Sequence, residues 1–252
     1  MFKNNFTYAP KNINNFAQFA DEVVIAVNTS EDDTLEGLKT IAAKYDNVKV
    51  ISTDISYDSI ELDGKIKDAA LQATTGDIKI QMDLDEYIPL SQKPKWESRA
   101  KSLLDLPYDG YMIATIDLWG DKDKIRADKN VGQKFRMHKA GLKRGIWHVA
   151  RRGDKIDTSM SDTCELLKAD GELAQCISIH DQNHFMPILV SQLNNSIFTI
   201  HEGYLDFEKK AELGRNFWKE RWEMYSGEEE NVPTRAEQLV NIPTIAHNLI
   251  LE

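Results

Sequence analysis

The chain contains 252 residues, of which 41% are hydrophobic and 29% are charged. This composition is typical of a soluble globular protein, and the length suffices for one large α/β domain with a helical appendage. The formal net charge of −10 argues against a nucleic-acid-binding protein, because such proteins present a basic face. An anionic ligand would need a metal ion or a few placed cations to attract it.

The first two-fifths of the chain alternate strands and helices. Residues 23–27 form a short continuous apolar run, which is typical of a strand covered on both faces. Apolar residues at helical spacing then predict helices over about 35–45 and 62–73, with a strand at 48–51 between them. This order predicts an α/β fold with a doubly wound, mainly parallel but mixed sheet that is flanked by helices.

The rest of the chain has a different pattern. Residues 111–119, 133–138 and 176–180 are expected to be strands, and the polar, Gly-containing loops between them favour an antiparallel or mixed arrangement. After residue 203 the apolar positions recur at helical spacing, which predicts a helical C-terminal segment packed on the body. The residues that carry this pattern are Phe207, Ala211, Trp218, Trp222, Tyr225, Leu239, Ile242, Ile245 and Leu249.

No targeting or membrane-spanning segment is expected. Residues 1–6 lack the apolar core of a signal peptide. No apolar run approaches the roughly 20 residues that cross a bilayer. The two cysteines, Cys164 and Cys176, are interpreted as free thiols in a reducing compartment. We therefore expect a cytoplasmic protein without a transmembrane segment.

The segment with the most chemical content joins an alternating strand pattern at 78–82 directly to Asp83, Asp85 and Glu86. Side chains at positions i and i+2 of a strand leave on the same side, so the two aspartates are expected to point to one spot at the end of a strand. Two such carboxylates repel each other unless a cation lies between them. The pattern predicts an oxygen-ligated divalent metal, with a phosphate-bearing substrate as a further ligand.

Three stretches of the chain, residues 19–34, 64–88 and 200–218, together resemble a glycosyltransferase of the family 2 type with a GT-A fold. In that family an Asp-x-Asp closes a strand after a K-x-x-A-x-x-x-x-x-G-D helix, and the residues of this chain assigned to that helix are Lys65, Ala69, Ala70, Gly76 and Asp77. The resemblance implies a catalytic domain over 1–203, with a nucleotide-sugar half at about 1–90 and an acceptor half at about 91–203. Residues 204–252 would be a helical extension.

The resemblance also implies site residues. Asp83 and Asp85 would hold Mn²⁺ or Mg²⁺, with Asp83 shared with the ribose, and His201 would complete the metal shell or touch the diphosphate. Lys65 would lie near the nucleotide. Asn28 lies in the loop where the family usually has an aspartate that binds the base or ribose. The donor would be a UDP-, GDP- or dTDP-sugar, and the acceptor a hydroxyl of a glycan, lipid or protein.

An inverting transfer needs a carboxylate that takes the proton from the acceptor hydroxyl. Asp162 is the preferred candidate and Glu165 the alternate, because two acids three residues apart on a first helical turn would lie on one side. The same pair also fits a capping box, with Asp162 as N-cap and Glu165 at N3. Trp119 and Trp147 could stack on a sugar ring, although burial is the commoner fate of an aromatic residue.

Three other interpretations are open. His180 and His184 form a rival metal site with helical spacing, although Pro187 follows too soon for a helix that would align them. A phosphohydrolase of the haloacid dehalogenase type also places Asp-x-Asp after an apolar strand, but that family has a Thr, Ser or Val where this chain has Tyr87. A GT-A-like domain could also have lost activity and serve as a binding module. The oligomeric state is open.

Overall fold

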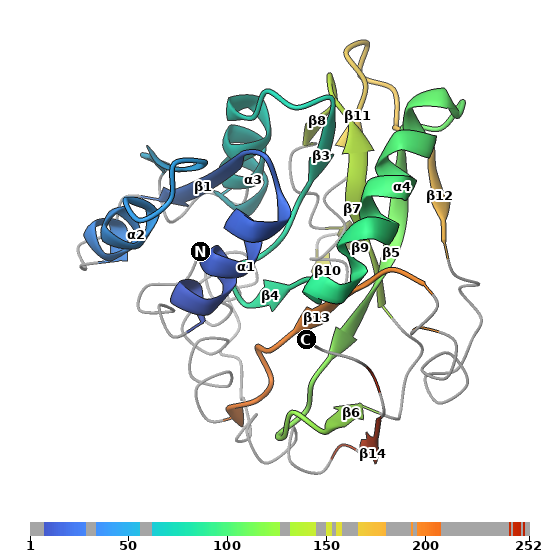
Figure 1. Cartoon of the computed structure of the whole chain (residues 1–252). Helices are drawn as coiled ribbons and strands as arrows, with labels where there is room; N and C mark the ends of the chain where they lie inside the picture. The colour runs from blue at the N-terminus through green and yellow to red at the C-terminus, as the bar shows by residue number, and fades with distance from the viewer. Residues whose placement is uncertain are drawn as a thin grey trace.

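Figure 1 shows the protein as a computed structural model of the whole chain. The structure describes residues 8–28, 34–55, 62–126, 132–144, 150–152, 155–157, 166–179, 193, 196–207, 242, 244–247 and 249. Within these ranges no helix combines the length and the apolar character that a membrane crossing requires.

The N-terminal part is a layer of two parallel strands with helices around them (Figure 1). Its elements are α1 (Ala9–Phe19), β1 (Val23–Asn28), α2 (Thr34–Ala42), β2 (Val48–Thr53) and α3 (Leu62–Ala73). Ile13, Ile25 and Leu38 are buried between the helices and β1, because each element turns its apolar positions to the same side. The predicted alternation of strands and helices over this stretch is confirmed.

A six-stranded mixed sheet forms the centre of the molecule. Its strands are β3 (Ile78–Ile80), β4 (Glu86–Tyr87), β5 (Gly110–Asp117), β7 (Gly132–Lys139), β12 (Cys176–Ser178) and β13 (Phe198–His201). The order is β3-β7-β5-β13-β4, and β12 pairs with the start of β5. Strands β12 and β13 run parallel to β5, whereas the β3–β7, β5–β7 and β13–β4 pairs are antiparallel. The predicted α/β fold with a mixed sheet flanked by helices is confirmed.

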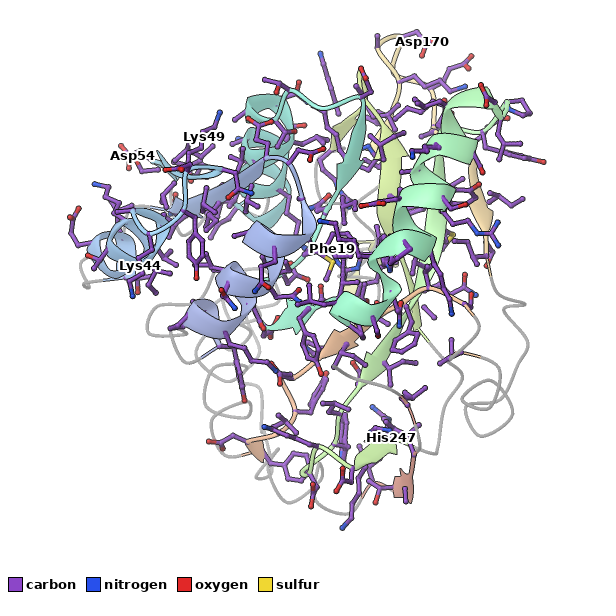
Figure 2. All side chains as sticks on the ribbon, viewed as in Figure 1. Phe19, Lys44, Lys49, Asp54, Asp170 and His247 are labelled. Carbon is purple, nitrogen blue, oxygen red and sulfur yellow. The ribbon has the colours of Figure 1, made fainter. Side chains whose placement is uncertain are left out.

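The central strand β5 is covered on both faces. Ile113 lies in one apolar cluster with Trp96 of α4 (Lys93–Asp105), which follows the short helix η1 (Leu90–Gln92). Ala114 and Ile116 lie in a second cluster, because successive side chains of a strand point to opposite faces. Figure 2 labels Phe19 at the centre of the molecule, where its ring meets Trp96 edge-on at 5.7 Å.

Short antiparallel pairs extend this core. They are β6 (Lys124–Arg126) with β14 (Thr244–Ala246), β8 (Lys143–Arg144) with β11 (Leu166–Leu167), and β9 (Ala150–Arg152) with β10 (Lys155–Asp157). The expectation of a helix around residue 245 is wrong for β14, because this segment pairs its backbone with β6, a partner that helical spacing cannot reveal. The predicted helix over 207–225 lies beyond residue 207 outside the described residues, and the division into domains stays a prediction.

The chain does not begin its described part with a strand. It begins with α1, which starts at Ala9 and has Pro10 in its first turn. Proline suits that position, because its fixed φ is helical and its missing N–H would be unpaired there anyway. This helix proves important for the site, because its polar residues contact the segment that carries the acids.

Candidate active site

The aspartate-bearing segment is a turn rather than the end of a strand. β3 ends at Ile80, residues 81–83 have no regular structure, and Leu84 and Asp85 form a turn before β4. The turn is closed by the Glu86 N–H, which donates to the Asp83 carbonyl over 3.1 Å. The expectation that Asp83 and Asp85 leave one strand on the same side is therefore wrong, and the two carboxylates have different neighbours.

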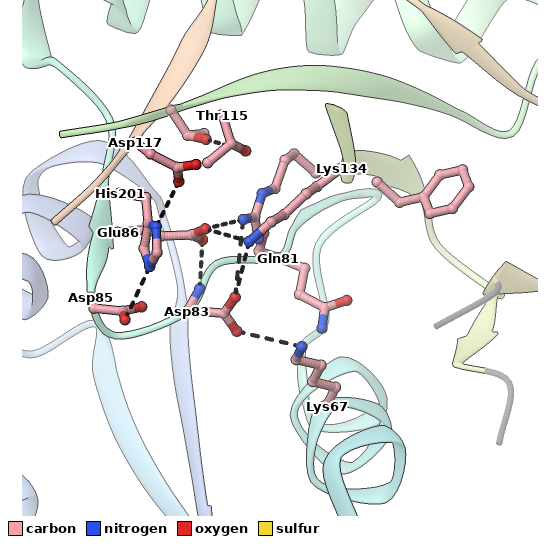
Figure 3. A network of polar contacts seen from close by, with 12 residues as sticks. Lys67, Gln81, Asp83, Asp85, Glu86, Thr115, Asp117, Lys134 and His201 are labelled. Atoms are coloured by element: carbon pink, nitrogen blue, oxygen red, sulfur yellow. Dashed lines mark hydrogen bonds and ion pairs between the residues drawn. The ribbon is translucent and has the colours of Figure 1, made fainter. Parts of the chain in front are cut away.

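Asp83 lies among three cations (Figure 3). Its carboxylate oxygens are 3.5 Å from Lys67 Nζ, 3.8 Å from Lys134 Nζ and 4.0 Å from Arg136 Nη2. Burial by itself would raise the pKa of Asp83, but the positive charges of these three side chains outweigh it and hold the pKa well below the usual range. Asp83 is therefore a carboxylate at neutral pH.

Glu86 anchors two of these cations from the inside. Its side chain is fully buried, pairs with the Arg136 guanidinium and accepts a hydrogen bond from Lys134 Nζ at 3.0 Å. Its second oxygen accepts the Asp83 N–H at 3.0 Å. Lys134 and Arg136 are two residues apart on β7, where a bulge leaves Arg136 without a register partner on β5, and both side chains reach Glu86. Burial lowers the pKa of Lys134, but the Glu86 charge prevails and leaves that pKa raised.

Asp85 belongs to a second group, with His201 and Asp117. The His201 ring has Nδ1 2.8 Å from Asp117 Oδ1 and Nε2 3.2 Å from Asp85 Oδ2 (Figure 3). Asp117 and His201 are register partners at the carboxyl ends of the parallel strands β5 and β13. Burial would lower the pKa of His201, but the two carboxylates raise it to about 9. The ring is therefore an imidazolium that donates from both nitrogens.

Backbone pairing brings Asp85 to His201 across 116 residues. β4 pairs with β13 so that Glu86 faces His201, and the Glu202 N–H donates to the Asp85 carbonyl at 2.8 Å. Helix α1 holds the same segment from the other side. Asn12 Nδ2 donates to the Leu84 carbonyl at 2.9 Å, and the Asn15 amide makes two hydrogen bonds with the backbone of Ile88. Lys11 forms a 2.6 Å ion pair with the buried Glu202.

The two expected nucleotide-binding residues lie apart from this cluster. Asn28 is buried at the end of β1, where its amide bonds the backbone of Ile55 in both directions and accepts from Thr53 Oγ1 at 3.0 Å. Lys65 is exposed on α3, and it is Lys67 of the same helix that pairs with Asp83. Neither placement tests whether the two residues bind a nucleotide, and that role stays a prediction.

Several other residues singled out in the sequence are only partly placed. Trp119 is buried and stacks on Tyr204 with ring centroids 4.3 Å apart, so its indole packs in the core rather than offering a stacking surface. The candidate bases Asp162 and Glu165 lie outside the described residues, as do Trp147, His180 and His184. Their roles stay predictions.

Sequence reasoning missed the cations and the second partner of the histidine. Lys134, Arg136 and Asp117 had no motif that marked them, and the lysine that fits the K-x-x-A-x-x-x-x-x-G-D spacing before Gly76 and Asp77 is Lys67 rather than Lys65. The alternation of Lys134 and Arg136 within a predicted strand was the one available signal, because it places both charges on one face. Their meeting with Glu86 depends on the register between β3 and β7.

Asp85 and His201 are better suited than Asp83 to act as ligands of a divalent metal. Asp117 accepts from His201 Nδ1 and so turns Nε2 toward Asp85, which is how a carboxylate outside the metal shell orients a metal-binding histidine. Asp83 instead faces three cations. Among the described residues, no three His, Cys, Asp or Glu side chains are grouped as a metal site by themselves. Substrate oxygens would have to supply the remaining ligands.

Comparison with known proteins adds little. No protein-family model and no curated protein sequence matches the chain. Among solved structures, the chain is similar to a fragment of S. aureus TarS, residues 1–349, with 14% identity, a TM-score of 0.45 and coverage of 93% of this chain and 66% of the fragment. A longer S. aureus TarS structure gives 13% identity, a TM-score of 0.43 and coverage of 93% and 40%. The chain thus spans less than two thirds of either structure, and similarity this low carries no conclusion about activity.

Proposed function

We propose that the chain is a glycosyltransferase that moves a sugar from a nucleotide-sugar to a hydroxyl acceptor, with a bound Mn²⁺ or Mg²⁺. The observation that supports this most is the convergence of Asp85, Asp117 and His201 from three separate segments. They meet at the carboxyl ends of β5 and β13, which is where ligands bind in sheets with parallel strands. The family 2 resemblance of residues 19–34, 64–88 and 200–218 points the same way.

Asp85 and His201 would hold the metal, and its chemistry there would be to neutralise charge on the departing nucleoside diphosphate. His201 must give up its Nε2 proton to become a ligand, since the neutral imidazole binds metals. Asp117 would keep the ring oriented by accepting from Nδ1 throughout. Whether Asp83 shares the metal or the ribose stays a prediction, as do the inverting mechanism and the role of Asp162 or Glu165 as base.

The proposal predicts that one or more of UDP, GDP and dTDP raises the melting temperature more in Mn²⁺ or Mg²⁺ than in EDTA. A screen of nucleotide-sugars should then find hydrolysis that needs the same metal. Asp85→Asn should lower this hydrolysis at least about 100-fold, because a metal supplies several kcal/mol of charge stabilisation. Asp46→Asn is the matched control, because Asp46 is exposed and distant in sequence from the acids.

Hydrolysis that is the same in Asp85→Asn and Asp46→Asn would refute the metal role of Asp85. Metal-dependent nucleotide binding without hydrolysis or transfer would favour the inactive binding module instead. Trapping of Asp83 as a beryllofluoride adduct would favour the phosphohydrolase, in which an aspartate is the nucleophile. No effect of any nucleoside diphosphate on the melting temperature would refute the glycosyltransferase proposal.

A further inference from the structure

We propose that Lys67 and Lys134 form a receptor for diphosphate oxygens that binds them without a metal. This inference rests on the proposed function, because it places the diphosphate of the donor beside Asp85 and His201. The two lysines come from different elements, α3 and β7, and their ammonium groups lie on either side of Asp83 (Figure 3). Such an arrangement is what a phosphate group with several oxygens can bridge.

The contacts of Asp83 with the lysines are loose. Its oxygens lie 3.5 and 3.8 Å from the two ammonium nitrogens, whereas charge-assisted hydrogen bonds of this type are about 2.7–2.9 Å long. Lys134 makes its close contact with Glu86 at 3.0 Å instead. Asp83 therefore balances charge without binding either lysine tightly, and a more highly charged anion can replace it as the partner.

Glu86 fixes the buried side of the cluster. Glu86 is fully buried and pairs closely with Arg136 and Lys134, so it holds these cations in place instead of competing for a ligand.

Solvent reaches the two lysines, as a ligand must. The side chains of Lys67, Lys134 and Asp83 are 24%, 37% and 31% exposed, whereas Arg136 and Glu86 are 4% and 0% exposed. The accessible part of the cluster is thus two ammonium groups and a loosely held carboxylate. Lysine binds phosphate as a compact point charge, which suits oxygens that arrive from solvent.

The test uses inorganic pyrophosphate as the probe, with EDTA present, measured by isothermal titration calorimetry at low and high salt. We expect binding that weakens as salt rises. Lys67→Met and Lys134→Met should each weaken it at least about tenfold, because each removes a hydrogen bond between two charged groups. Lys101→Met is the matched control and should bind as the wild type does, since Lys101 is an exposed lysine on another helix, α4. Lys67→Arg should restore most of the affinity, which separates lost charge from lost fold.

No pyrophosphate binding by the wild type in EDTA would overturn the proposal, and so would equal affinities of Lys67→Met and Lys101→Met. The outcome is distinguishable from that of the glycosyltransferase proposal. Pyrophosphate binding through the lysines without any hydrolysis of nucleotide-sugars would refute the glycosyltransferase proposal and support the diphosphate receptor. Metal-dependent hydrolysis of a nucleotide-sugar by a protein that binds no pyrophosphate in EDTA would refute the diphosphate receptor and support the glycosyltransferase proposal.

Discussion

His138 should make the protein sensitive to mild acid. Its side chain is fully buried on β7, and its Nδ1 lies 2.9 Å from the Lys139 carbonyl, so the neutral ring donates there. Its Nε2 atom is buried without a hydrogen-bond partner. Burial lowers the pKa of His138 from 6.5 to about 4, with smaller contributions from the charges of Arg144 and Lys79. The folded protein therefore resists protonation that the unfolded chain accepts.

The magnitude follows from this difference in pKa. Between pH 6.5 and 4 the unfolded chain binds a proton that the folded protein does not, so the free energy of unfolding falls as pH falls through this window. A shift of about 2.5 units corresponds to about 3 kcal/mol in total, of which about 2 kcal/mol is lost by pH 5. Above pH 6.5 the contribution is constant, because His138 is neutral in both states.

Urea unfolding at pH 7, 6 and 5 would measure the effect. His138→Asn removes the titration and keeps an N–H donor near the Lys139 carbonyl, so its free energy of unfolding should fall by about 2 kcal/mol less than that of the wild type between pH 7 and 5. Thr40→Asn serves as the control, since Thr40 is exposed on α2 and its side chain does not titrate, so its pH dependence should match the wild type. Equal pH dependence of His138→Asn and the wild type would refute the reasoning.

Two further predictions concern the packing around the site. Glu86→Gln leaves the Arg136 guanidinium and the Lys134 ammonium without their buried counter-charge, so it should lower the free energy of unfolding by about 3–5 kcal/mol. Chemical denaturation measures this loss. A loss of only about 0.5 kcal/mol, as for a surface substitution, would contradict the prediction. Gly120→Ala should lower the free energy of unfolding more than Gly141→Ala does. Both glycines have positive φ, but an added Cβ at Gly120 would lie 3.0 Å from the Phe207 ring, whereas one at Gly141 would meet nothing within 4 Å. We expect about 1–2 kcal/mol for Gly141→Ala from the backbone alone, and equal melting temperatures of the two variants would show that the ring yields freely.

The elements with a strong local pattern were predictable. In β1, α2 and α3 the buried side chains lie close together in the sequence, as a continuous apolar run in β1 and at helical spacing in α2 and α3. Such a pattern can be recognised within about ten residues of sequence. Helix α1 was not predicted, and the helix expected around Ile245 is strand β14, because contacts with other elements decide the state of both segments. Polar residues of α1 bond the acid-bearing segment, and β14 exists as the partner of β6.

The candidate site divides in the same way. Asp83, Asp85 and His201 were expected to lie together from the resemblance to a family, and the structure places His201 against Asp85. Asp83 has other neighbours, because β3 ends at Ile80 and the chain turns at Leu84 and Asp85 instead of continuing as a strand. A turn of this kind depends on the hydrogen bonds of Glu86 and Asn12 to residues 83 and 84, and no spacing of acids in the sequence reveals it.

The sequence by itself determined the acidic charge, the α/β order of elements and the residue types that could bind a metal or a phosphate. These properties depend on composition and on periodicity within about ten residues. Only the tertiary structure decided which carboxylate meets which cation. Asp85 meets His201 because β4 pairs with β13 in a particular register. Asp83 meets Lys134 because β3, which leads to Asp83, pairs with β7, and Lys67 reaches Asp83 from α3. A register shifted by one residue would turn each side chain to the opposite face, so the site exists only in the folded sheet.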